Sequence, residues 1–181
     1  MINIKKTKFN IFILGDTQVG KTCIIQILKD NTFNPDEFPT IGMTTFMYIF
    51  QFEDKDYKFK IFDTSGREKY KNIILSKLHL ADGFMFVFSV DNKESLKQVD
   101  AWNHIIDENI RLKKMKLLIG NKIDIQKRKI SNQEALNFAN ERKMKYFETS
   151  AKTGFSIKDT FKHFFQDLYE SNRQYELKNN I

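Results

Sequence analysis

The hydrophobic positions along the chain form two kinds of pattern that follow one another in turn. Short, almost continuous apolar runs predict buried strands, and they lie at residues 8–15, 43–52, 57–63, 82–90, 116–121 and 145–150. Longer segments with apolar residues at helical spacing predict helices, and they lie at residues 21–31, 93–110, 131–142 and 155–172. Strands that alternate with helices predict an α/β fold with a six-stranded, mostly parallel sheet and helices on both faces.

Two polar loops interrupt this alternation. Residues 30–42 contain both prolines of the chain, Pro35 and Pro39, and we expect no regular structure there because proline has no N–H and restricts the residue before it. Residues 63–72 are polar, contain a glycine and follow a strand directly. Both loops should leave the same edge of the sheet as residues 15–22, and ligands of α/β folds bind at this edge.

The segment "GDTQVGKT", residues 15–22, stands between a predicted buried strand and an amphipathic helix. This context is the one in which the Gly-x-x-x-x-Gly-Lys-Thr pattern forms a phosphate-binding loop. Its backbone N–H groups and the helix N-terminus present partial positive charge to phosphate oxygens. Lys21 would reach the β- and γ-phosphates, and the Thr22 hydroxyl would bind Mg²⁺. The alternative, for this motif alone, is a glycine turn beside a surface lysine.

Three further strand ends carry polar residues that suit a guanine nucleotide with Mg²⁺. Asp63 ends a hydrophobic strand and can hold Mg²⁺ through water. Asp124, in "NKID", can accept hydrogen bonds from both N1–H and the 2-amino group of guanine, a pair that adenine does not offer. In "ETSAK", the Ala151 N–H is placed to donate to the guanine carbonyl. These motifs in register with the phosphate loop are a strong signal, and they disfavour a phosphate-loop kinase that uses ATP.

Composition and charge narrow the function further. The 181 residues suit one domain, 1–181, with a short C-terminal tail from about residue 173. The single cysteine, Cys23, forms no internal disulfide and fits a reducing compartment, so we expect a cytoplasmic protein, one that cycles to endomembranes. We also expect a monomer. The net charge is +7, but the densest basic runs, residues 111–116 and 126–129, should lie at opposite ends of one strand. We therefore expect no nucleic-acid partner.

Taken in order, "GDTQVGKT", "TIGMTTF", "DTSGREKY", "GNKID" and "ETSAKTG" resemble the five motifs of the Ras superfamily of small GTPases. The resemblance covers residues 8 to about 172. The chain is most similar to the Rab branch, because the spacing from Thr40 to Asp63 is one residue longer than is usual in Ras or Rho proteins. There is also no room between Asn121 and Ser150 for the additional helix of Rho proteins.

This resemblance implies a set of site residues. Those expected to bind GTP or GDP are Gly15, Asp16, Thr17, Gln18, Val19, Gly20, Lys21, Thr22, Cys23, Phe33, Thr40, Gly66, Asn121, Lys122, Asp124, Ser150, Ala151 and Lys152. Those expected to bind Mg²⁺ are Thr22, Thr40 and Asp63, and those expected to act in hydrolysis are Lys21, Thr40, Gly66 and Arg67. It also implies a switch that recruits effectors in vesicle trafficking, with an exchange factor and a GTPase-activating protein as further partners.

Arg67 stands where the family has a glutamine that orients the attacking water. Glutamine both donates and accepts hydrogen bonds, whereas guanidinium only donates. Slow unassisted hydrolysis is our hypothesis, and a partner that supplies the missing glutamine is an equal alternative. A third reading makes Arg67 an internal arginine finger. A GTP-binding scaffold with negligible hydrolysis is the alternative function.

Three more positions depart from the family. Gln18 replaces a common glycine of the phosphate loop, so its side chain must point away from the phosphates. Of the aromatic cluster that meets effectors, only Phe62 fits, whereas Thr45 and Lys77 stand at the other positions and Phe46 is shifted by one. The chain ends without the prenylated cysteines of Rab proteins. Either a prenylated tail lies outside this sequence, in which case we expect membrane attachment, or the protein is not prenylated.

Overall fold

The computed structural model describes residues 6–110 and 114–178. Its elements are β1 (Lys8–Leu14), α1 (Lys21–Asp30), β2 (Met43–Phe52), β3 (Lys55–Thr64), α2 (Lys71–Leu75), β4 (Gly83–Ser89), α3 (Lys93–Asn109), β5 (Met115–Asn121), α4 (Asn132–Glu141), β6 (Lys145–Glu148) and α5 (Ile157–Lys178). Short 3₁₀ turns at Glu68–Tyr70 and Leu78–Leu80 flank α2. None of the helices within these residues is long and apolar enough to cross a bilayer.

The six strands form one sheet in the order β2-β3-β1-β4-β5-β6. Only β2 and β3 are antiparallel, and the other four pairs are parallel. The β2–β3 hairpin turns at Glu53 and Asp54, whose φ angles of 45° and 62° suit a two-residue type I′ turn. The predicted six-stranded, mostly parallel sheet is confirmed.

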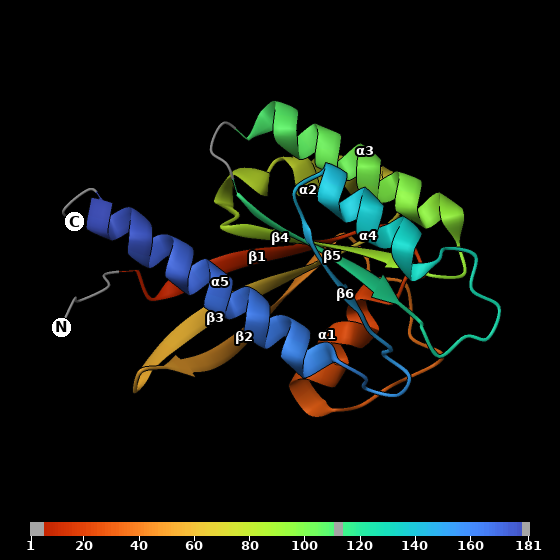
Figure 1. The fold of residues 1–181 in the computed structure, drawn as a ribbon, viewed down its shortest axis with the longest axis horizontal. Coiled ribbons are helices and arrows are strands. Elements are labelled where there is room, and N and C mark those ends of the chain that lie inside the picture. Colours follow the sequence, from red (N-terminus) through yellow and green to blue (C-terminus); the bar gives the residue numbers. More distant parts are fainter. Residues whose placement is uncertain (1–5, 111–113, 179–181) are drawn as a thin grey trace.

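Helices cover both faces of the sheet (Figure 1). On one face, α1 and α5 pack over a core that includes Phe59 and Phe165, whose ring centroids are 4.0 Å apart. On the other, α2, α3 and α4 pack over a core around Phe86 and Trp102. Because β1 and β4 are buried from both sides, they hold the strand ends that form the site in fixed positions.

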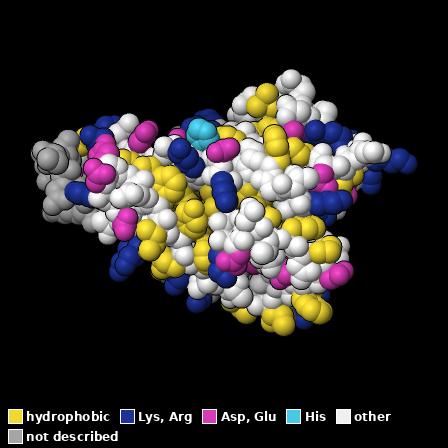
Figure 2. All heavy atoms as spheres, turned by 90° about the horizontal axis from the view of Figure 1, so that it is seen from below, with side chains coloured by type: hydrophobic (Ala, Val, Ile, Leu, Met, Phe, Trp, Pro, Cys, Tyr) yellow, Lys and Arg dark blue, Asp and Glu magenta, His cyan; other side chains and the backbone are white. Residues whose placement is uncertain are grey.

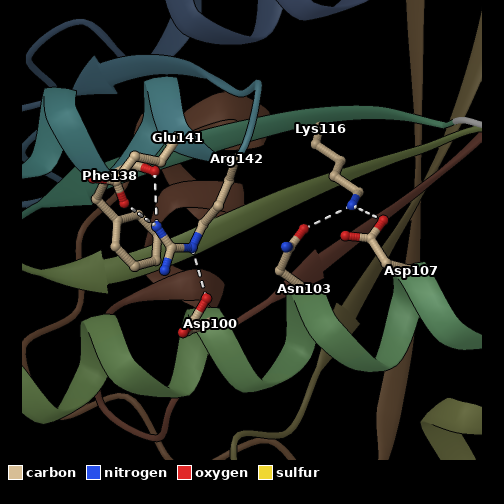
Figure 3. Close-up of polar contacts among 7 residues, drawn as sticks. All are labelled: Asp100, Asn103, Asp107, Lys116, Phe138, Glu141 and Arg142. Carbon is tan, nitrogen blue, oxygen red and sulfur yellow. Dashed lines mark hydrogen bonds and ion pairs between the residues drawn. The ribbon is translucent and has the colours of Figure 1, made fainter.

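Polar contacts connect α3 to the elements beside it (Figure 3). The Arg142 guanidinium stacks on the Phe138 ring of α4, 3.6 Å from its centroid, and its Nε donates to Asp100 of α3 at 2.6 Å. Lys116 of β5 donates to Asn103 of α3 at 2.7 Å and also to Asp107. These contacts help to fix the helical layer that lies away from the site.

The structure differs from the sequence prediction in three elements. The last helix does not end near residue 172, because α5 continues to Lys178, and the predicted tail from about residue 173 is wrong to that extent. The predicted loop 63–72 contains a 3₁₀ turn and the start of α2, which we did not predict. The strand predicted at 145–150 ends at Glu148. Part of the basic run at 111–116 lies outside the described residues.

Candidate functional site

A cavity of about 590 Å³ lies where β1, β3 and β5 end. Most of the predicted nucleotide-binding residues line it, namely Thr17, Gln18, Gly20, Lys21, Thr22, Cys23, Phe33, Thr40, Gly66, Asn121, Lys122, Asp124, Ala151 and Lys152. Gly15, Asp16, Val19 and Ser150 support this lining from behind through the contacts described below, and so does Asp63. The structure therefore brings five separate motifs to one hollow, at the edge of the sheet where ligands of α/β folds bind.

The loop between β1 and α1 holds a buried ammonium group. Lys21 is only 6% exposed, and its Nζ donates to the backbone carbonyls of Gly15 at 2.9 Å and Asp16 at 2.6 Å. Burial lowers the pKa of Lys21 to about 8, although the charges of Asp63 and Asp16 act in the opposite direction. An ammonium in this position lacks a full counter-charge, which a phosphate group would provide.

The conformation of the same loop explains one of its glycines and exposes strain at a neighbouring residue. Gly20 has φ 94°, and a Cβ there would lie 2.4 Å from the amide nitrogen of the Asn121 side chain. Gln18 also has a left-handed φ, 59°, which is unfavourable for a residue with a side chain. The glutamine that replaces the family's glycine at position 18 therefore strains the backbone, in addition to the space that its side chain needs.

Three side-chain oxygens meet beside Lys21 in an arrangement that fits a small hard cation. The Thr22 Oγ1 donates to Asp63 Oδ2 at 2.7 Å and lies 2.9 Å from Thr40 Oγ1, which is itself 3.3 Å from Asp63 Oδ2. The other carboxylate oxygen of Asp63, Oδ1, is buried and has no hydrogen-bond partner among the residues that the structure describes. Burial raises the pKa of Asp63, while the hydrogen bond from Thr22 and the charge of Lys21 oppose this. A buried carboxylate with an unused oxygen and two hydroxyls beside it suits Mg²⁺.

At the other end of the cavity, Asn121 connects the loops that would hold a base. Its Nδ2 donates to the Val19 carbonyl at 2.8 Å, and its Oδ1 accepts from Thr149 Oγ1 at 3.2 Å and from Ala151 N at 3.1 Å. We expected the Ala151 N–H to point to a guanine carbonyl, and here it is used by Asn121. Asn121 therefore holds the phosphate loop and the last strand end together.

The acceptor expected to read guanine is also held in place. Ser150 Oγ donates to Asp124 Oδ1 at 2.6 Å, which leaves the second carboxylate oxygen of Asp124 for a ligand. Lys122, Lys152 and the half-exposed Phe33 line the cavity around it. This end of the cavity thus combines one carboxylate with apolar and aliphatic surfaces, as a flat purine requires.

Gly66 and Arg67 are neighbours in the chain but have different environments. Gly66 sits directly on the phosphate loop, where a Cβ would lie 2.2 Å from the Thr17 nitrogen. Arg67 is exposed and does not line the cavity. Its backbone N–H donates to Ser65 Oγ at 3.3 Å, but within the described residues its guanidinium makes no polar contact. The structure therefore does not bring Arg67 together with Lys21 and Thr40.

Sequence reasoning missed several residues of the site. Thr149 was not singled out, although it lies inside "ETSAK" and fixes Asn121. Nor was Thr64, whose hydroxyl donates to the Ile13 carbonyl at 2.6 Å. Asn34, Glu37, Phe38, Ser65 and Ile125 also line the cavity. For Asn34, Glu37 and Phe38, the sequence predicted only that they belong to the proline-containing loop 30–42. It did not assign any of them to the site.

The aromatic positions on β2 and β3 agree with the expected departure from the effector-binding cluster. Phe62 is buried and stacks on Phe12, with ring centroids 4.3 Å apart, and Thr45 is its cross-strand neighbour. Phe46 points to the opposite face of the sheet, where it packs beside Tyr48. Because successive residues of a strand face opposite sides, Phe46 cannot replace an aromatic residue at position 45.

Comparisons with known proteins agree with this site. The sequence model of the Ras family matches residues 10–170. Ras-related protein Rab-13 of Bos taurus is 32% identical over 173 residues, which cover 95% of this chain and 85% of that protein. GTP-binding protein YPT1 of Saccharomyces cerevisiae is 32% identical over 170 residues, covering 93% and 82%, and Rab-10 of Diplobatis ommata is 31% identical over 163 residues, covering 90% and 82%. The chain therefore belongs to the Ras family and is a Rab-like small GTPase.

Proposed function

We propose that this chain binds GTP and GDP together with Mg²⁺ in the 590 Å³ cavity and acts as a switch that recruits effectors in vesicle trafficking. The observation that carries the proposal is the pairing of a buried ammonium with a buried, half-satisfied carboxylate. Lys21 and Asp63 lie at the same end of the cavity, and each is an unfavourable buried charge without a ligand. A phosphate with Mg²⁺ would satisfy both.

Each part of the nucleotide has a group that suits it. Lys21 and the loop N–H groups would bind the phosphates, and Asp124 would select guanine. Thr22, Thr40 and Asp63 would hold Mg²⁺, which screens the phosphate charge when bound. Thr40 belongs to loop 30–42 and Gly66 to the segment after β3. Both segments would become ordered when the γ-phosphate of GTP is bound and would lose that order when it is absent.

Hydrolysis without a partner is slow in this proposal because of Arg67. The exposed guanidinium offers no acceptor for a proton of the attacking water. A GTPase-activating protein that supplies a glutamine would restore turnover. The alternatives are an Arg67 that acts as an internal arginine finger and a scaffold that binds GTP with negligible hydrolysis.

The proposed partners and place of action follow from the Rab relatives. We propose an exchange factor, a GTPase-activating protein and effectors as protein partners, and a cytoplasmic protein that cycles to endomembranes. Attachment to those membranes requires a lipidated tail outside this sequence. Thr45 and Lys77 stand where Rab proteins have effector-binding aromatic residues, so this cluster does not identify the effectors.

The test is single-turnover GTP hydrolysis by the Mg²⁺-loaded protein and by two variants. Arg67→Gln supplies a group that both donates and accepts, and we expect hydrolysis to accelerate about tenfold or more. Arg67→Ala removes the charge without adding an acceptor, and we expect no acceleration. Because Arg67 is exposed and its side chain has no partner among the described residues, neither variant should disturb the fold.

Each other outcome supports a different reading. If Arg67→Ala slows hydrolysis and Arg67→Gln does not accelerate it, Arg67 contributes to catalysis and the proposal of slow hydrolysis fails. If all three proteins bind GTP tightly and none turns it over, the scaffold reading holds. If none of them binds GTP in preference to ATP, the proposed function itself is wrong.

A further inference from the structure

The two edges of the sheet are built very differently. At one edge, β6 has four residues, Lys145–Glu148, and carries a charge at each end. At the other, β2 has ten residues, Met43–Phe52, with the sequence "MTTFMYIFQF". That strand contains no charged residue and no proline. Short length, charges and prolines are the devices that keep sheet edges from pairing with other chains, and β2 has none of them.

Each face of β2 exposes apolar side chains to solvent, beside the exposed polar residues Thr44, Thr45 and Gln51. On one face, Met47 is 49% exposed and Ile49 is 56% exposed. On the other, a row of aromatic residues is only partly covered by α5 and the core, and it consists of Phe46, Tyr48, Phe50 and Phe52. Figure 2, which views the molecule from below, shows hydrophobic side chains gathered in a band over this part of the surface.

The backbone of β2 also presents hydrogen-bonding groups outward. Phe52 and Lys55 flank the two-residue turn and form its closing pair, and hydrogen-bonded pairs alternate along an antiparallel ladder. The even-numbered residues therefore bond to β3, as the Gly42 carbonyl does when it accepts from Ser65 N at 2.9 Å. It follows that Thr45, Met47, Ile49 and Gln51 direct their N–H and C=O groups away from the sheet.

We propose that β2 pairs with β2 of a second copy of this chain, antiparallel and around a two-fold axis at Tyr48. This register places Tyr48 opposite itself, Phe46 opposite Phe50, Met47 opposite Ile49 and Thr45 opposite Gln51. Within residues 45–51, every aromatic, aliphatic and polar residue meets one of its own kind, and the match ends outside them, where Thr44 lies opposite Phe52. An axis at Met47 would instead place Thr45 opposite Ile49 and lose this match. The aromatic and aliphatic pairs are the kind that stabilise a sheet.

The charges around β2 permit this pairing although the chain as a whole carries +7. The nearest cations on the exposed face are Lys58 and Lys60 of β3, which lie beside Ile49 and Met47. In the dimer, Lys60 of one copy and Lys58 of the other are separated by three strand spacings, about 14 Å. That exceeds the distance over which physiological salt screens exposed charges, about 8 Å.

This pairing is a closed arrangement and replaces our expectation of a monomer. The two β2 strands pair with each other, so the only free edge among the described strands of each copy is the short, charged β6. Assembly should therefore stop at the dimer, with one continuous sheet. The inference does not depend on the nucleotide, because no residue of β2 lines the cavity.

Sedimentation equilibrium of the GDP-bound chain and its variants tests the register. Met47→Lys and Ile49→Glu each place a charge against an apolar residue of the second copy, and we expect each to raise the dissociation constant about tenfold or more. A mixture of these two variants should form dimers again, because the introduced ammonium of one copy then faces the introduced carboxylate of the other. A mixture of Met47→Lys with Ile49→Lys is the control, since it differs from the first mixture only in the sign of the charge at position 49. Two ammonium groups then face each other, so this mixture should stay dissociated.

Leu136→Lys on α4 is the matched surface control, because Leu136 is 37% exposed and α4 contacts β6, the edge of the sheet opposite β2. It should leave the dissociation constant unchanged. A wild-type chain that stays monomeric at about 100 µM overturns the proposal, since a micromolar dissociation constant would give mostly dimer. A dimer that survives both single variants, or single variants that dissociate and are not restored by mixing, also overturns it. Restoration by mixing shows at the same time that both variants fold.

Discussion

Gln18 occupies a position where the backbone is left-handed, with φ 59°. A residue with a Cβ pays about 1–2 kcal/mol for this conformation, whereas glycine adopts it freely but costs about 0.5–1 kcal/mol in the entropy of the unfolded chain. We therefore expect Gln18→Gly to raise the free energy of unfolding by about 0.5–1 kcal/mol. Urea unfolding at saturating GDP and Mg²⁺ measures it, after correction for any change in GDP affinity.

Thr17→Gly is the control for this prediction, because Thr17 lies in the same loop and is not among the residues with positive φ. It should lower the free energy of unfolding by about 0.5–1 kcal/mol, since the entropy cost has no strain relief to offset it. If both variants shift the free energy of unfolding in the same direction, the strain at Gln18 is not the cause.

Single residues of the site differ in how well their environment follows from sequence. Lys21, Thr22 and Asp63 were placed at one end of a phosphate site from motif and context alone, and the structure puts them within one cluster. The left-handed backbone at Gln18 was not predicted. A glutamine in place of the family's usual glycine indicates that the site accepts a side chain, but it does not indicate the φ angle of the backbone. The orientation of the Ala151 N–H depends on Asn121 and on whether a base is present, so no local pattern predicts it.

At the scale of elements, one carboxylate connects the two loops at the base-binding end. Glu148, the last residue of β6, accepts from Arg128 at 2.6 Å and from Tyr146 at 2.8 Å. Arg128 belongs to the loop that follows "NKID", and its Nε also donates to the Ile130 carbonyl at 2.7 Å. Burial alone would raise the pKa of Glu148, but hydrogen bonds from Arg128, Asn132 and Tyr146 outweigh it and lower the pKa.

We expect a double-mutant cycle of Arg128→Ala and Glu148→Ala to give a coupling free energy of about 1–2 kcal/mol at pH 7. The sign of its pH dependence follows from the lowered pKa of Glu148. The coupling should be complete above the ordinary glutamate pKa, near 4.5, and should be lost as the pH falls through the lower value of the folded protein. Urea unfolding at pH 7 and at lower pH measures it. A coupling that is unchanged by acid would mean that the pair is not ionic.

Elements with a strong periodic pattern were predicted well, and those whose ends depend on tertiary contacts were not. The buried runs of β1, β4 and β5 carry an almost continuous apolar signal. By contrast, α2 has five residues and follows a polar loop, which is too short for a helical period to appear in the sequence. The last turns of α5 are polar on most sides, so an apolar stripe could not mark where the helix ends.

At the scale of the whole molecule, stability should depend on the ligand that the cavity binds. Without a ligand, the described site keeps a buried ammonium and a carboxylate oxygen that lacks a partner. A ligand that binds only the folded state at 100 times its dissociation constant adds about 2.7 kcal/mol to the free energy of unfolding. We expect GDP with Mg²⁺ to do so, and ATP with Mg²⁺ at the same concentration to have a much smaller effect, because Asp124 finds no pair of donors on adenine.

Asp63→Asn distinguishes the contribution of Mg²⁺ to this stabilisation from the contribution of the nucleotide. The amide keeps the size of the side chain and its hydrogen bonds to Thr22 and Thr40, but it removes the charge that Mg²⁺ requires. We expect GDP to raise the melting temperature of this variant equally with and without EDTA, whereas EDTA should reduce the effect of GDP on the wild type. If EDTA lowers the melting temperature of both proteins to the same extent, Mg²⁺ is held by other groups. In that case the orphaned oxygen of Asp63 has a structural origin, and the charge balance at this end of the cavity rests on Lys21 and the phosphates alone.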